Sequence, residues 1–261
     1  NVFMVAFRTV PNNSKGVAHI LEHTALCGSE KFPVRDPFFT MIRRSLNTFM
    51  NAFTTSDYTA YPFASQNRKD YFNLMEVYLD AVFFSRLDPL DFAQEGHRVE
   101  FEVPEDPTSS LLYKGVVYNE MKGDDSSPVS RLYHAVQSEL YPTSTYHFNS
   151  GGDPRNIPDL SYQELLHFYQ THYHPSNAIF MTFGNISAIE QQQKIAEYGL
   201  NRLDPNDVSE VHVLPEPRYS APRKLETRYP VDDSDLSAKT HLVIAWLLGA
   251  NTDLKMLLKG H

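Results

Sequence analysis

Apolar residues recur along this chain at two spacings, which predict a mixture of strands and helices. Residues 2–9 and 178–183 are short apolar runs rich in β-branched and aromatic residues, as strands usually are. In residues 68–85 the apolar side chains recur at helical spacing and form a stripe typical of a core-facing helix. Further helices are expected at 17–27, 38–46, 91–96, 127–141, 162–171 and 187–200, and further strands at 97–103, 224–229 and 241–248.

Residues 48–63 are rich in Thr and aromatic residues and contain a polar turn at Ser56-Asp57. This composition predicts two strands of a hairpin. The apolar and polar positions do not alternate cleanly, so two interpretations stay open. The hairpin belongs to a sheet covered on one face, or it forms an edge strand that pairs with an extended peptide.

The C-terminal part differs in composition and predicts a change of domain. Residues 203–222 hold four prolines and few apolar pairs, which is typical of a linker. An acidic turn at 231–235 follows, and the apolar run 241–248 is predicted to be a buried strand that opens a second unit. We therefore expect a first unit over residues 1–202, a linker over 203–238 and the truncated start of a second unit over 239–261.

Composition and charge narrow the class of protein. The chain has 261 residues, of which 41% are hydrophobic, enough for a packed core. Its net charge of −9 and the absence of a Lys/Arg cluster argue against a nucleic-acid partner. The one cysteine excludes an internal disulfide framework and weakly favours a reducing compartment.

Neither a membrane span nor a targeting segment is visible in the sequence. The longest apolar run, 241–248, is far shorter than the roughly 20 residues that a transmembrane helix needs. The chain has no starting Met and opens directly in a predicted strand. We infer that it is a fragment whose first strands and targeting segment are absent.

The motif His19-Ile20-Leu21-Glu22-His23 is the strongest chemical signal. Each residue of a helix turns by about 100°, so His19 and His23 lie roughly 40° apart on one face. Two imidazoles one turn apart can hold one zinc ion, with the Glu22 carboxylate beside them. This is the His-Glu-x-x-His metalloprotease pair in reverse order.

A third metal ligand is needed, and the residues alone leave its identity open. Cys27 continues the spacing, but eight residues rise about 12 Å along a helix, too far from His19 for a shared ion. Cys27 is therefore interpreted as a small buried residue. Glu120 follows a strongly apolar stretch and is a candidate ligand, because a buried carboxylate needs a partner or a metal. Glu95 is a weaker candidate, and for both the alternative is a solvated or ion-paired carboxylate.

Two further histidines and one glycine pair are predicted to have no metal-binding or phosphate-binding role. His172 and His174 have no acidic or cysteine partner nearby in the sequence, so we expect them to be packed or exposed at a helix exit. The Gly151-Gly152 pair is interpreted as a turn, because no Gly-Lys-Ser/Thr follows it and it cannot be a phosphate loop.

With these residues placed, the chain resembles the pitrilysin-type (inverzincin) metallopeptidases, and within them the presequence protease branch. The similarity extends from residue 2 to about residue 185. Its blocks are His19 to Ser29, Arg35 to Phe39, Asn51 to Thr54, Gly115 to Gly123, Ser150 to Pro154 and His172 to Asn177. Broader members often carry an acid two turns before the third ligand, where this chain has Tyr113, and that difference fits the presequence branch better.

The resemblance implies a role for each matched residue. The zinc ligands would be His19, His23 and Glu120. Glu22 would be the catalytic residue, the general base that takes the proton from the attacking water. The edge strand that holds the substrate backbone would be Asn51, Ala52 and Phe53.

The resemblance also implies a fold and a setting. It implies an α+β fold, an αβ roll in which an antiparallel-rich sheet is packed by helices on one side, with the zinc site in residues 1–202. It further implies unfolded peptide substrates such as cleaved presequences, the mitochondrial matrix as location, and a missing C-terminal half that closes the chamber. The alternatives are a catalytically inactive truncated homologue or partner subunit that binds peptide, and a mitochondrial processing peptidase subunit.

Overall fold

The computed structural model describes residues 1–205, 212–231, 234–250 and 252–260. The strands are β1 (Val2–Arg8), β2 (Asn47–Met50), β3 (Phe53–Thr54), β4 (Tyr58–Ser65), β5 (Arg98–Phe101), β6 (Leu111–Lys114) and β7 (Ala178–Phe183). The α-helices are α1 (Val17–Ala25), α2 (Pro37–Arg44), α3 (Arg68–Phe83), α4 (Pro89–Glu95), α5 (Val116–Asp125), α6 (Pro128–Leu140), α7 (Tyr162–His172), α8 (Ala188–Tyr198) and α9 (Leu254–Gly260). Short 3-10 turns lie at Thr145–His147, Ile157–Asp159, Pro175–Asn177 and Leu200–Arg202.

The main sheet is antiparallel and has the order β2-β4-β1-β7, with β3 also paired to β4. In its centre Val5 of β1 lies opposite Tyr61 of β4 on one side and Phe180 of β7 on the other. The predicted hairpin is confirmed, because β3 pairs with β4 and the Thr55 N–H donates to the Tyr58 carbonyl at 2.8 Å. The long-range pairing of β1 with both neighbours places the start of the chain in the middle of the sheet.

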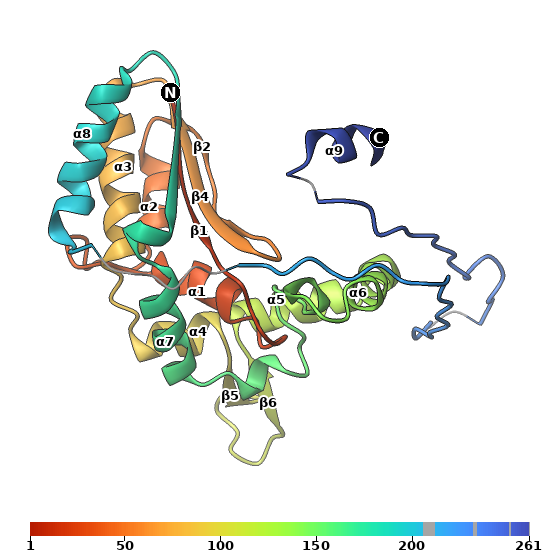
Figure 1. The fold of residues 1–261 in the computed structure, drawn as a ribbon. Coiled ribbons are helices and arrows are strands. Elements are labelled where there is room, and N and C mark those ends of the chain that lie inside the picture. Colours follow the sequence, from red (N-terminus) through yellow and green to blue (C-terminus); the bar gives the residue numbers. More distant parts are fainter. Residues whose placement is uncertain (206–211, 232–233, 251, 261) are drawn as a thin grey trace.

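Helices cover one face of this sheet, and the other face is open (Figure 1). Alternate residues of β1 explain this difference, since Phe3, Val5 and Phe7 are fully buried on the helix side. On the opposite face Val2 is 39% exposed and Ile179 of β7 is 67% exposed. The predicted α+β fold, with an antiparallel sheet packed by helices on one side, is therefore confirmed.

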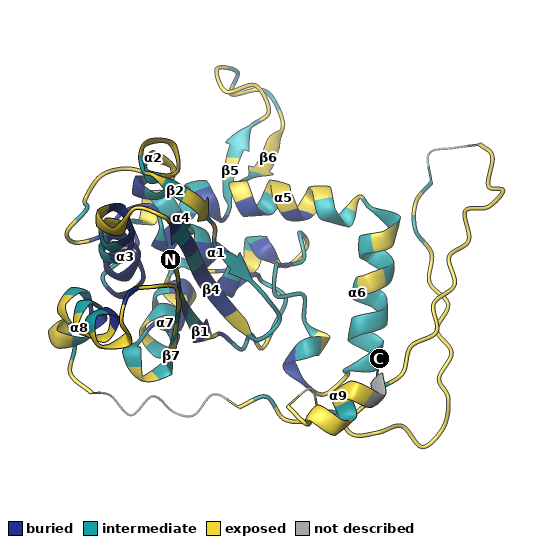
Figure 2. Cartoon of the chain, turned by 90° about the horizontal axis from the view of Figure 1, so that it is seen from above, coloured by how far each residue is buried: buried dark blue, intermediate teal, exposed yellow. Residues whose placement is uncertain are grey.

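Burial falls steeply from this sheet toward the α5–α6 arm and the C-terminal segment (Figure 2). The largest buried side chains come from β1, β4, α1 and α3, and they form one core cluster. By contrast, no residue of α6 is buried, and α5 buries only Val117 and Met121. Among the described residues, no helix is long and apolar enough to cross a bilayer.

Most predicted elements begin and end within two residues of the expected positions. One predicted helix cap, Asp36, does not form. Ser161 and Glu164 make the expected reciprocal capping box at the start of α7. Pro37 stands at the first position of α2 as expected, but Asp36 adopts a left-handed conformation with φ 52° and its side chain makes no capping bond. Strand β6 and the helices α5 and α9 were not predicted.

Two predicted C-terminal strands are wrong. Residues 224–229 and 241–248 have no regular secondary structure, and Leu242 and Trp246 are 87% and 72% exposed. A strand needs backbone partners, and the described residues provide none beside these segments. Of the predicted acidic turn, Asp232 and Asp233 lie outside the described residues. The division at 203–238 and 239–261 stays a prediction.

Candidate metal centre

Helix α1 presents His19 and His23 on one side while its other side enters the core. Ile20 and Leu21 are fully buried against the sheet. The helix begins after Gly16, whose φ of 72° is in the left-handed region that glycine adopts easily. The two imidazole rings lie one turn apart, with centroids separated by 5.0 Å. The helical spacing of the motif thus places both rings at one location.

Glu120 of α5 completes this cluster from about a hundred residues later in the chain. Its Oε2 atom lies 3.7 Å from His19 Nε2 and 3.9 Å from His23 Nε2. Bonds of about 2.0–2.1 Å at a tetrahedral angle put neighbouring ligand atoms roughly 3.4 Å apart. One potential ligand atom from each of the three residues lies within 4.8 Å of the other two, so the donor set fits a single zinc ion.

The other ring nitrogen of each histidine has a partner of its own. His19 Nδ1 lies 3.0 Å from the Gly151 carbonyl oxygen, and His23 Nδ1 lies 3.2 Å from Glu95 Oε2. When these Nδ1 atoms donate, both Nε2 atoms keep a lone pair directed toward Glu120. The structure thus does not support Glu95 as a ligand, because its carboxylate meets the ring nitrogen that points away from the ligand cluster.

Burial and hydrogen bonding act in opposite directions on the His23–Glu95 pair. Burial alone lowers the pKa of His23, but the hydrogen bond to Glu95 and the nearby carboxylates raise it above its ordinary value. Burial alone raises the pKa of Glu95, but the bonds from His23 and Gln94 leave that pKa lowered. The pair therefore favours an ionised carboxylate beside the ring.

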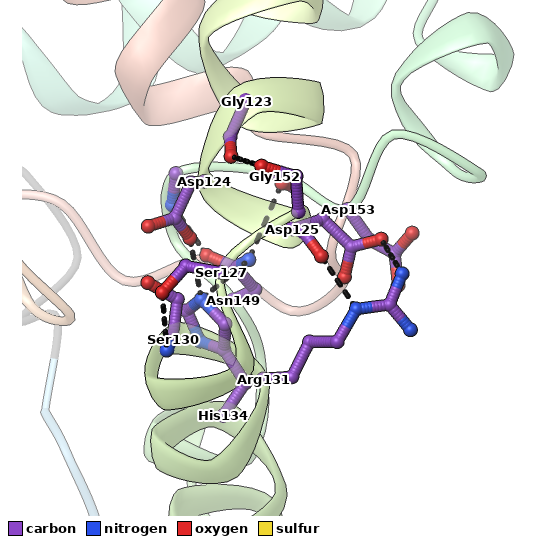
Figure 3. Close-up of polar contacts among 12 residues, drawn as sticks. Gly123, Asp124, Asp125, Ser127, Ser130, Arg131, His134, Asn149, Gly152 and Asp153 are labelled. Carbon is purple, nitrogen blue, oxygen red and sulfur yellow. Dashed lines mark hydrogen bonds and ion pairs between the residues drawn. The ribbon is translucent and has the colours of Figure 1, made fainter. Parts of the chain in front are cut away.

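The loop that carries Asn149, Gly152 and Asp153 lies at the corner between α5 and α6 (Figure 3). Asp124 of α5 and His134 of α6 make a contact of 3.0 Å between Oδ2 and Nε2. Asn149 Nδ2 lies 3.5 Å from His134 Nε2, and Asn149 Oδ1 accepts a hydrogen bond from the Gly151 N–H at 3.1 Å. This polar network connects the helix that bears Glu120 to the loop whose carbonyl meets His19.

Glu22 lies on α1 next to the ligands and is held by the sheet. The residue is 7% exposed, and its Oε2 accepts a hydrogen bond of 2.6 Å from the Thr54 hydroxyl of β3. Burial is the largest influence and raises the pKa of Glu22, while the Thr54 bond opposes this rise. A carboxylate with a raised pKa beside a metal cluster is suited to accept a proton.

A cavity of about 630 Å³ joins the ligand cluster to the sheet edge. Asn51, Ala52 and Phe53 line this cavity together with His19, Glu22, His23 and Glu120. Within the described part of the chain, β2 and β3 pair with β4 alone, so this segment lies at an edge of the sheet. The role of this edge segment in binding a peptide stays a prediction.

The residues interpreted without a metal role are placed as expected. Cys27 is 8% exposed, and burial strongly raises the pKa of its thiol. His172 stacks on Phe168 at 3.8 Å between ring centroids, and His174 accepts from the Ser176 N–H. Neither histidine is among the residues that line the cavity.

Three contacts of the site were not predicted: those of Thr54 with Glu22, Glu95 with His23 and Gly151 with His19. Each joins residues 32 to 132 positions apart, so no spacing rule reveals it. The adjacent glycines Gly151 and Gly152 were the available signal, since paired glycines mark close backbone approach. The Cβ of any other residue at Gly16 would meet the Gly151 oxygen at 2.8 Å.

Comparison with known proteins gives two family matches. Residues 8–120 match the family model described as insulinase (peptidase family M16), and residues 159–256 match the model described as peptidase M16 inactive domain. The first match contains His19, Glu22, His23 and Glu120. The second begins before α7 and extends into the C-terminal segment.

Individual relatives agree with these matches. The chain is 51% identical over 258 residues to a mitochondrial presequence protease of Xenopus laevis, covering 97% of this chain and 25% of that protein. A solved protease from Helicobacter pylori has a TM-score of 0.64 at 20% identity, covering 83% of this chain and 49% of that one. Pitrilysin has a TM-score of 0.59 at 20% identity, covering 85% of this chain and 22% of that one. At these identities the solved structures show the fold alone, and the chain spans about a quarter of the length of the curated relatives it matches.

Proposed function

The chain belongs to the M16 peptidase family, and on that premise we propose that it is the zinc-binding part of a metalloendopeptidase. The proposed substrates are unfolded peptides such as cleaved mitochondrial presequences, and the proposed location is the mitochondrial matrix. The name of the 51% identical relative, a mitochondrial presequence protease, supports presequence substrates and a mitochondrial location.

The observation that carries this proposal is the meeting of His19, His23 and Glu120. Two imidazoles and one carboxylate are ligands that zinc accepts, and three protein ligands leave a fourth position open as catalytic sites do. When bound, zinc supplies Lewis acidity that polarises a peptide carbonyl and lowers the pKa of water. The two Nδ1 contacts orient the rings so that their Nε2 atoms face Glu120.

In this proposal Glu22 takes the proton from the water that attacks the peptide bond, and later delivers it to the leaving amine. Its burial supports this role, because a pKa raised toward the working pH makes proton transfer in both directions easier. The Thr54 hydroxyl holds Oε2 and thereby limits the rotation of the carboxylate. Proton transfer then needs no movement of the helix.

The sheet edge at Asn51, Ala52 and Phe53 is proposed to hold the substrate backbone in an extended conformation. An edge segment offers backbone groups to an incoming strand, which gives affinity with little dependence on substrate sequence. Its position beside Glu22 in one cavity supports this role, since a peptide paired there passes the ligand cluster. Such binding suits a protease that degrades many unfolded peptides.

The 261-residue chain alone is proposed to bind zinc but to cleave peptides poorly. The Glu120 side chain is 54% exposed, so solvent reaches the ligand cluster. Electrostatic interactions in an active site become stronger when closure excludes water. We propose that the remaining part of a longer protein supplies that closure and further substrate contacts.

The test uses the full-length protein and the substitution Glu22→Gln. We expect the variant to retain one zinc ion per chain, measured by metal analysis, and to lose about 10²–10⁴-fold in peptide turnover. Glu197→Gln, the same chemical change on the exposed face of α8, is the matched control and should keep full turnover. Normal turnover by Glu22→Gln refutes the general base, and a zinc-free but active wild-type enzyme refutes the metal mechanism.

A further inference from the structure

Glu95 places a carboxylate in the interior beside the metal cluster. The residue is 8% exposed, and it comes from the last position of α4, whereas His23 is on α1. A buried carboxylate is costly unless hydrogen bonds compensate it. Here His23 Nδ1 lies 3.2 Å from Oε2, and the Gln94 side chain donates to Oε1 at 2.9 Å.

A close crossing of two glycines brings Glu95 to this position. An added Cβ at Gly115, which precedes α5, would lie 2.0 Å from the Gly96 carbonyl oxygen. An added Cβ at Gly96 would meet Ile20 of α1 at 3.1 Å. The end of α4 is therefore packed between α1 and the start of α5, the two helices that carry the ligand cluster.

The geometry separates Glu95 from the metal ligands. An imidazole has two nitrogens on different sides of the ring, so they cannot both face the same ion. His23 Nε2 is the nitrogen near Glu120, at 3.9 Å, and Nδ1 is the nitrogen near Glu95. Within the described residues the cluster of possible ligand atoms contains His19, His23 and Glu120 and not Glu95.

We propose that Glu95 is a positioning residue, whose carboxylate accepts the Nδ1 proton of His23 and so directs Nε2 of that ring at the metal. This inference deepens the proposed function and rests on its zinc site. A carboxylate behind a ligating histidine fixes the ring and its tautomer and increases the basicity of the coordinating nitrogen. In His19 the corresponding Nδ1 atom meets the backbone carbonyl of Gly151, which carries no formal charge.

The experiment measures the zinc dissociation constant of the 261-residue chain by competition with a chelator. Glu95→Leu removes the acceptor and should raise the dissociation constant about 10–100-fold. Glu95→Gln keeps a carbonyl oxygen and should raise it less. Both variants should still bind one zinc per chain. Glu197→Gln is the matched control, and circular dichroism of the metal-free proteins checks that each variant is folded.

A second measurement needs no variant. In the zinc-loaded wild-type chain, nitrogen NMR of the histidine rings should show His23 protonated at Nδ1 and metal-bound at Nε2. A purely structural carboxylate would not determine which nitrogen binds the ion.

Three results overturn the inference. The first is a Glu95→Leu dissociation constant within about twofold of the wild-type value. The second is a His23 ring bound to zinc through Nδ1. The third is a cobalt-substituted spectrum that changes coordination number in Glu95→Gln, which would make Glu95 a ligand. A wild-type chain that binds no zinc refutes the metal centre of the proposed function itself, so the two failures are distinguishable.

Discussion

Replacing Thr54 by Val should destabilise the metal-free protein through Glu22. The valine side chain has nearly the same shape but cannot donate to Glu22 Oε2, which accepts at 2.6 Å in the wild type. A hydrogen bond to a charged group contributes about 1.5–3 kcal/mol. Since Glu22 is only 7% exposed, solvent compensates little for the lost donor, and we expect a loss of this size in the free energy of unfolding.

Thr54 also lies 3.2 Å from the Thr59 hydroxyl, so a single substitution measures two contacts. A double-mutant cycle with Glu22→Leu separates them, because the Thr59 contact is lost in both halves of the cycle. Urea unfolding of the wild type, both single variants and the double variant should give a coupling energy of about 1.5–3 kcal/mol near pH 8. Thr54→Ser keeps the hydroxyl and serves as the matched control.

The pH dependence of this effect has a definite sign. Burial raises the folded-state pKa of Glu22 above its ordinary value of 4.5, so ionisation of Glu22 costs stability as the pH rises from 4.5 through the raised value. Loss of the Thr54 hydrogen bond raises the pKa of Glu22 further and so increases the free-energy cost of ionising Glu22 in the folded state. The coupling should therefore be small near about pH 4 and complete near about pH 8. A coupling below about 0.5 kcal/mol at the higher pH, or one that does not change with pH, refutes this account of Glu22.

Other predictions concern packing and reactivity. Gly115→Ala places a Cβ 2.0 Å from the Gly96 carbonyl, so it should cost about 1–3 kcal/mol in thermal or urea unfolding and weaken zinc binding. Gly123→Ala lies inside α5, where an added Cβ has no described atom within 4 Å apart from its chain neighbours and its own helix backbone, and it should instead stabilise by about 0.5–1 kcal/mol; equal effects would contradict the glycine crossing. The buried Cys27 thiol, with its raised pKa, should react with a thiol reagent much more slowly in the native than in the unfolded protein, and equal rates would show that it is accessible. Ser161→Ala removes the α7 capping box and should cost about 1 kcal/mol of unfolding free energy, whereas an unchanged midpoint would contradict that.

The main elements could be predicted because their patterns report burial. In β1 the buried Phe3, Val5 and Phe7 alternate with residues of the open face. Helix α3 shows its core stripe at helical spacing in the same way. The run 241–248 is equally apolar, yet it forms no strand, because strand formation depends on partners that local composition does not specify.

In the site, too, the residues within one motif could be predicted, whereas contacts between distant segments could not. His19, Glu22 and His23 follow from spacing within one helix, and Glu120 was proposed from its apolar context and from the resemblance to a known family. The supporting contacts of Thr54, Glu95 and Gly151 depend on how distant segments pack, so no short motif contains them. Glu95 was a weaker candidate for the third ligand, with a solvated or ion-paired carboxylate as the alternative, and the structure pairs it with a histidine nitrogen.

The central claim is that His19, His23 and Glu120 hold one zinc ion, and X-ray absorption at the zinc edge tests it most directly. For the zinc-loaded chain we predict one ion with two imidazole nitrogens and one carboxylate oxygen at about 2.0–2.2 Å, and loss of tight binding in Glu120→Gln. A chain that binds no zinc, or a Glu120→Gln variant with wild-type affinity and an unchanged spectrum, would contradict it.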